Sequence, residues 1–79
     1  METQQVREMI ERGIQTSFVE VEGDGTHFQA VVVSEQFRGK PPLERHKLVY
    51  AALGDAMESE IHAISIKTYT DDQWEKLKK

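Results

Sequence analysis

Residues 27–69, HFQAVVVSEQFRGKPPLERHKLVYAALGDAMESEIHAISIKTY, determine the topology of the chain. The segments 27–34 and 60–69 are both rich in β-branched residues, which predicts two strands. Between them, Pro42 suits the first turn of a long helix that continues to about residue 56. A strand, a helix and a second strand require a crossover connection, so we expect the two strands to be parallel.

The residues before this stretch predict a helix and a further strand. Residues 15–22, QTSFVEVE, alternate apolar residues with glutamates, and the glycine-rich turn at 22–26 would join them to the strand that follows as a hairpin. In the segment 2–12, apolar residues recur at helical spacing, and Gly13 suits the helix end. The segment 35–42 is predicted to be a loop or a single helical turn.

The residues after this stretch predict a short last helix. Thr70 is followed three residues later by Gln73, which is the pattern of a capping box, and Trp74 and Leu77 would dock the helix. The predicted order is therefore α-β-β-α-β-α within one domain spanning residues 1–79. We expect an α+β fold with a three-stranded mixed sheet and its helices on one face.

The long helix has a broad predicted apolar arc that also contains two polar residues. The arc comprises Leu43, Leu48, Val49, Tyr50, Ala52, Leu53, Ala56 and Met57. Arg45 and His46 fall within it, while Lys47 lies outside. We predict that Arg45 and His46 are mainly structural. The alternative is that they contact an anion or a partner together with Arg38, Lys40 and Lys47, the one concentration of positive charge in the sequence.

Composition excludes several classes of protein. The chain has 79 residues, a formal charge of −4 and no cysteine, so disulfides, thiolate nucleophiles and all-cysteine metal sites are excluded. No apolar run approaches the roughly 18 residues of a membrane span, and the first residues do not form a secretory signal. We expect a cytoplasmic-type compartment. No nucleotide-binding, hydrolase or metalloprotease motif is present, which predicts a protein without catalytic activity.

Two segments of the sequence resemble the BolA family. They are FRGKPPLERHKLVY at 37–50 and IHAISIKT at 61–68, the second followed shortly by Trp74. The similarity is greatest to the short bacterial branch often called IbaG. The resemblance implies a class II KH-like fold, in agreement with the element order, and an adaptor that pairs with a monothiol glutaredoxin to share a [2Fe–2S] cluster.

The resemblance also implies which residues would bind that cluster. The partner and its glutathione would supply thiolates, and His62, near the start of the last strand, would supply an imidazole. His27, in the hairpin, matches a second ligand position of the family. On its own residues, His62 is a competent iron ligand in a chain without cysteine, and we expect it to share a face of its strand with Ile64 and Ile66. A structural role for either histidine is the alternative.

Two further hypotheses stay open at this stage. The first is a DNA-binding regulator that uses the basic segment 38–47, since other BolA proteins are associated with DNA. KH domains hold a nucleic-acid backbone with a Gly-x-x-Gly loop, but here Gly39 is followed by Lys-Pro-Pro, which removes a glycine and two amide donors. The net acidity also disfavours this hypothesis. The second is a homodimeric accessory protein.

Overall fold

The fold was analysed in a computed structural model that describes residues 1–78. The main helices and strands follow the predicted order, and the structure adds a short helix, α3, before the last strand. The elements are α1 Thr3–Gly13, β1 Phe18–Gly23, β2 His27–Val33, the 3₁₀ helix η1 Glu35–Phe37, α2 Pro42–Leu53, α3 Ala56–Ser59, β3 Ala63–Tyr69 and α4 Asp71–Lys78.

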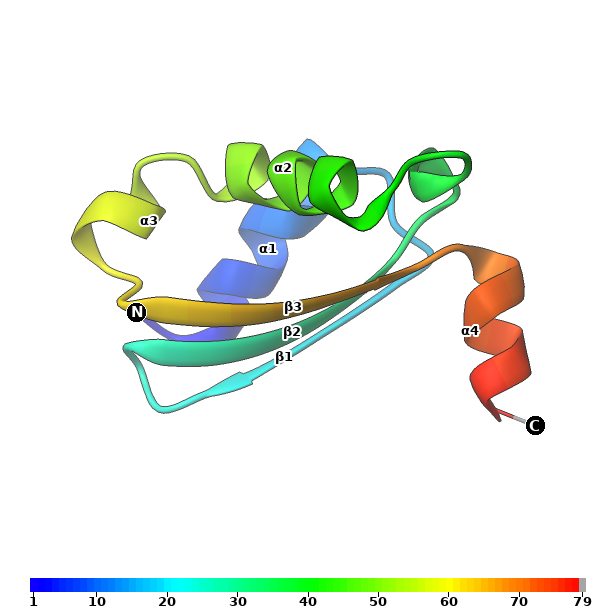
Figure 1. The fold of residues 1–79 in the computed structure, drawn as a ribbon. Coiled ribbons are helices and arrows are strands. Elements are labelled where there is room, and N and C mark those ends of the chain that lie inside the picture. Colours follow the sequence, from blue (N-terminus) through cyan, green and yellow to red (C-terminus); the bar gives the residue numbers. More distant parts are fainter. Residues whose placement is uncertain (79) are drawn as a thin grey trace.

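The sheet has β2 at its centre. β1 pairs with β2 antiparallel as a hairpin, and β3 pairs with β2 parallel through the crossover that contains α2. The predicted α+β fold and mixed sheet are confirmed. Figure 1 shows α1, α2 and α3 covering one face of the sheet, whereas α4 lies beyond the end where β3 finishes. The other face of the sheet is largely open.

The core lies between the sheet and the three helices on its covered face. It is built from alternate residues of the strands and from one stripe of each helix: Val6, Ile10, Ile14, Val19, Phe28, Ala30, Val32, Phe37, Val49, Leu53, Ala56 and Ile61. Gly13 allows α1 and α2 to approach closely, because a Cβ at this position would lie 2.6 Å from the Cβ of Ala52. Burial of these apolar side chains is the main source of stability.

One predicted helix and one predicted strand are longer than the elements in the structure. The helix predicted to reach residue 56 ends at Leu53, because Gly54 takes a positive φ of 53° and α3 then starts separately. The predicted strand 15–22 begins only at Phe18. The residues before it are held as a connection, since Ser34 Oγ donates to the Gln15 carbonyl oxygen and the Gln15 amide donates to Gln36 Oε1.

The predicted apolar arc of α2 is wrong at two positions. Leu43 is 67% exposed and Tyr50 is 41% exposed. The two residues are seven apart and so lie on one stripe of the helix, an outer stripe to one side of the buried residues. The stripe that faces the core contains Val49 and Leu53, and Arg45 continues it toward the first turn.

The last helix is capped as predicted. The Thr70 amide donates to Gln73 Oε1 (2.9 Å) and the Gln73 amide donates to Thr70 Oγ1 (3.3 Å), a reciprocal capping box. Trp74 then stacks on Phe18 of β1 at 5.2 Å between ring centroids and packs against Tyr69 of β3 at 5.4 Å. The predicted docking of Leu77 is wrong, because this side chain is 60% exposed. Since none of its side chains is fully buried, α4 depends on this cap and on Trp74.

Thr70→Ala is expected to loosen α4 without unfolding the domain. Loss of an N-cap hydroxyl costs about 1 kcal/mol, and the core lies elsewhere. Amide hydrogen exchange within 71–78 should accelerate, and the fluorescence of Trp74 should shift toward that of an exposed indole. Thr70→Ser keeps the hydroxyl and is the matched control, so equal exchange in the two variants would contradict a capping role.

Candidate functional site

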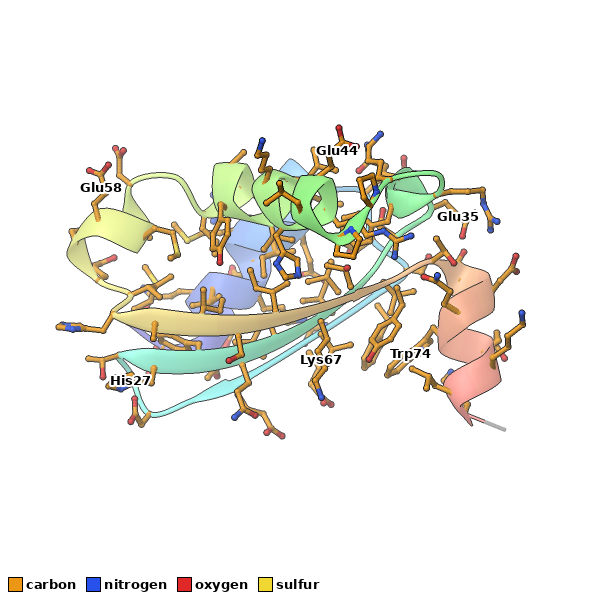
Figure 2. The ribbon with its side chains drawn as sticks, in the orientation of Figure 1. His27, Glu35, Glu44, Glu58, Lys67 and Trp74 are labelled. Atoms are coloured by element: carbon orange, nitrogen blue, oxygen red, sulfur yellow. The ribbon has the colours of Figure 1, made fainter. Side chains whose placement is uncertain are left out.

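Two histidines meet at the hairpin end of the sheet. His27 is the first residue of β2, and His62 directly precedes β3. The two histidines lie close together because the parallel register pairs His27 with Ala63, the residue after His62. Their ring centroids are 6.1 Å apart, and both side chains are exposed. Figure 2 shows His27 at this end of the molecule and Trp74 at the other. We call His27 and His62 the histidine pair.

The predicted strand position of His62 is wrong. His62 lies in a bend before β3, and it is exposed, whereas Ile64 and Ile66 are half-buried against the core. The bend arises because the amides of His62 and Ala63 both donate to the Thr26 carbonyl oxygen, at 2.9 and 3.3 Å. Because His62 lies in this bend and not within β3, its imidazole is exposed at the rim of the domain, where a second protein can reach it.

Asp24 and Thr26 organise the hairpin next to His27. Asp24 Oδ1 accepts from the backbone amides of Thr26 (3.0 Å) and His27 (2.9 Å), which fixes the turn. Thr26 Oγ1 donates to Asp24 Oδ1 at 3.3 Å and lies 3.1 Å from His27 Nδ1. A hydroxyl that donates to the carboxylate accepts from the ring, so this arrangement favours a proton on Nδ1 and a free lone pair on Nε2.

Sequence analysis recognised the turn but missed these two residues as supports of His27. The signal available was the Asp-x-Thr-His order at 24–27, since an aspartate commonly accepts hydrogen bonds from amides two and three residues later. Histidines that bind metals usually have their second ring nitrogen held in this way.

The Asp24 carboxylate is strongly stabilised by the turn that it forms. Hydrogen bonds from the backbone amide of His27 and then from that of Thr26 lower the pKa of Asp24 from 3.8 to about 2. The carboxylate is therefore ionised in every ordinary buffer, and it keeps its acceptor role for the hairpin even in strongly acidic solution.

Asp24→Asn is expected to destabilise the protein in a pH-dependent way. The pKa of Asp24 is lower in the folded chain than in the unfolded chain, so ionisation favours folding. This contribution is complete above the unfolded value of 3.8 and is lost as the pH falls toward 2. Urea unfolding of both proteins should show a constant difference at neutral pH that shrinks over this window. An Asp24 carboxyl carbon resonance that titrates near 3.8 would contradict the assignment.

By itself the histidine pair does not supply a complete set of metal ligands. Within residues 1–78, no group of three or more His, Cys, Asp or Glu side chains is placed to hold a metal ion. Two neutral imidazoles are suitable ligands for iron, but a cluster needs about four ligands. The residues present therefore fit a metal group whose remaining ligands come from another molecule.

The basic segment 38–47 lies at the other end of the sheet, and its two arginines make internal contacts. Arg38 pairs with Glu35 at 2.7 Å and with Asp72 at 3.1 Å, and the hydrogen bond that it donates to the Glu35 carboxylate raises the pKa of the guanidinium. Arg45 Nε donates to the Lys40 carbonyl oxygen and Nη1 donates to Gln73 Oε1. Both arginines thus connect the loop before α2 to α4.

The remaining basic residues have fewer internal contacts. Lys47 is exposed, and Lys40 and His46 are half-buried. None of the three takes part in an ion pair in the described part of the chain. The positive charge that is free to meet an anion is therefore smaller than the sequence predicts, and it comes mainly from Lys40 and Lys47.

Comparison with known proteins places these features in a family. The family model described as "BolA-like protein" matches residues 4–73. The chain belongs to the BolA family. It is 35% identical over 75 residues to the "Acid stress protein IbaG" of Escherichia coli, covering 94% of this chain and 89% of that protein. The solved structure of a BolA homologue from Coxiella burnetii has a TM-score of 0.87 at 50% identity, covering 95% of this chain and 97% of that one.

Other BolA relatives are longer. The "DNA-binding transcriptional regulator BolA" of Vibrio cholerae is 44% identical over 55 residues, which are 70% of this chain but 52% of that protein. The chain thus spans about half of that relative's length, and its match covers 38% of the bovine "BolA-like protein 1". These BolA proteins are named as a regulator and a stress protein rather than for a reaction. Among the described residues, no helix of this BolA chain has the length and apolarity to span a bilayer.

Proposed function

We propose that this BolA protein is a non-enzymatic adaptor that completes the ligand set of a [2Fe–2S] cluster held jointly with a monothiol glutaredoxin and glutathione. The observation that carries the proposal is the exposed histidine pair, with rings 6.1 Å apart at one end of the sheet. The setting would be a cytoplasmic-type compartment, where thiolates of the partner stay reduced.

The residues of this chain have distinct roles in the proposal. His62 presents an unhindered imidazole from the bend before β3, and we assign it as the principal ligand. His27 is oriented by the contact of its Nδ1 with Thr26, which leaves Nε2 available to a ligand. Asp24 holds the turn in place and stays anionic down to about pH 2. When bound, the cluster would supply one-electron chemistry or be passed on as cargo.

The proposal is tested by the visible absorption spectrum after co-purification with a monothiol glutaredoxin. The isolated protein should be colourless and free of iron, because a chain with three histidines and no thiolates cannot complete a cluster. The complex should be coloured, with a spectrum that differs from that of the glutaredoxin alone. A stable brown cluster in the isolated protein would refute the partner-supplied ligand set.

A second candidate function is DNA binding through Lys40 and Lys47. It is favoured by the names of two relatives, the DNA-binding regulators of Vibrio cholerae and Escherichia coli. Phosphate contacts alone give weak, salt-sensitive binding that is indifferent to sequence. A tight, sequence-selective complex at physiological salt would make this the leading function.

The double variant Lys40→Glu/Lys47→Glu is expected to abolish any DNA binding. The logarithm of the affinity falls linearly with the logarithm of the salt concentration, and each lost phosphate contact makes this slope shallower by about one. Lys67→Glu is the matched control, because Lys67 lies on the open face of the sheet away from this segment (Figure 2). Binding that depends on Lys67 instead would exclude the basic segment as the interface.

A further inference from the structure

We propose that the free edge of β1 binds an extended segment of another protein in which cationic residues alternate with small β-branched residues. The proposal does not depend on the histidine pair. Within residues 1–78, β1 is the first strand of the sheet and pairs only with β2, so its other edge has no strand beside it.

The hydrogen-bonding groups at this edge follow from the hairpin register. The Asp24 amide donates to the His27 carbonyl oxygen. In an antiparallel ladder the bonded residues alternate, so the N–H and C=O groups of Glu22 and Glu20 face β2. Those of Val19, Val21 and Gly23 face the free edge. An added strand could therefore form main-chain hydrogen bonds along the length of β1.

A groove runs beside this edge between β1 and α1. Its walls are Thr3, Gln4, Arg7, Glu8 and Glu11 from the helix and residues 18–21 from the strand. An added strand would lie in this groove beside β1, with alternate side chains next to those of Val19 and Val21. Small β-branched residues suit these positions, because α1 limits the depth.

Negative charges beside the edge favour positively charged side chains at the alternate positions of the added strand. Glu20 and Glu22 are exposed on the open face of the sheet, and Glu8 is exposed on the helix wall. None of these three forms an ion pair within residues 1–78, while Arg7 is engaged by Glu11 at 3.6 Å. Lysine or arginine side chains opposite Glu20 and Glu22 would be favoured.

The same glutamates disfavour a second copy of this chain. Two β1 strands that joined antiparallel through their free groups would pair odd residues with odd residues. Glu20 would then lie opposite Glu20 or Glu22 of the other copy in the central registers. Like charges opposite each other destabilise a strand pair, and charged edges of this kind protect sheets from self-association.

The test uses a capped heptapeptide that alternates valine and lysine, with a valine–glutamate peptide as its control. Fluorescence anisotropy should show salt-sensitive binding of the lysine peptide only. Amide hydrogen exchange should slow at Val19, Val21 and Gly23. Glu20→Lys/Glu22→Lys should weaken binding about tenfold, and methylating the lysine peptide on the pairing amides should abolish it.

Matched variants separate this edge from other surfaces. Glu58→Lys/Glu60→Lys reverses two exposed charges outside the groove and should leave peptide binding unchanged, as should His62→Ala. Glu20→Gln/Glu22→Gln removes the charge with less perturbation and should weaken binding to a smaller extent. Equal binding of the glutamate peptide, protection at other amides, or dimerisation of the free chain through β1 would overturn the proposal.

Discussion

His62→Ala is expected to abolish the mixed-ligand cluster while leaving both the fold and the association with the glutaredoxin intact. The side chain is exposed and precedes β3, so its loss removes no core contact. Protein recognition uses a surface wider than one side chain. The co-purified complex should retain only a cluster ligated by thiolates of the partner and glutathione.

Three measurements distinguish the wild-type complex from this variant. The wild-type complex should have the higher reduction potential, because a neutral imidazole in place of a thiolate lowers the negative charge around iron. It should also be more acid-labile, since protons compete with the metal for the ring nitrogen. Its spectrum should differ as well. If His62→Ala matched the wild type in reduction potential, acid stability and spectrum, His62 would not be a ligand.

His27→Ala supplies a graded comparison for the same experiment. The imidazole of His27 contacts Thr26, whereas that of His62 is exposed in the bend before β3. We therefore assign His27 the secondary role. The variant should weaken or alter the cluster without eliminating the complex. An effect larger than that of His62→Ala would reverse the assignment of the two histidines.

Phe37→Ala is expected to remove much of the stability of the domain. Phe37 has no exposed surface and is among the largest fully buried side chains, although it lies in a short 3₁₀ helix. The guanidinium of Arg45 lies 5.9 Å from its ring centroid. Truncation of a buried phenylalanine costs about 3–5 kcal/mol, against a total of about 5–15 kcal/mol for a folded domain.

The measurement is the midpoint of urea unfolding, followed by circular dichroism. Leu43→Ala is the matched control, because this leucine is 67% exposed. We expect it to change stability by no more than about 0.5 kcal/mol. Similar losses in both variants would contradict the assignment of Leu43 to the outer stripe of α2.

The topology could be predicted because each element carries a local signal. The glycine-rich turn at 22–26, the strand–helix–strand order and the capping box at Thr70 all act over a few residues. The errors concern features that the local sequence pattern does not determine, namely which side of α2 is buried and where that helix ends. An apolar arc does not show which of its edges meets the sheet, so Tyr50 was assigned to the core, and a lone Gly54 did not reveal that the helix stops there.

The candidate site could be predicted only in part. The resemblance pointed to both histidines, but their proximity depends on the offset between β2 and β3, which no local pattern encodes. The contacts of Arg38 were also beyond prediction, because its partner Asp72 is distant in the sequence. Such pairings follow from how the layers assemble.

The central position of β2 also implies an order of folding. The hairpin with β1 closes over a few residues, whereas the parallel pairing with β3 must enclose residues 34–62 and so carries the larger loss of chain entropy. Local contacts generally form faster than distant ones, so we expect the hairpin that contains His27 to form before β3 brings His62 beside it. On the proposed function, a chain in which β3 has not yet docked would lack the histidine pair and could not complete the ligand set of the cluster.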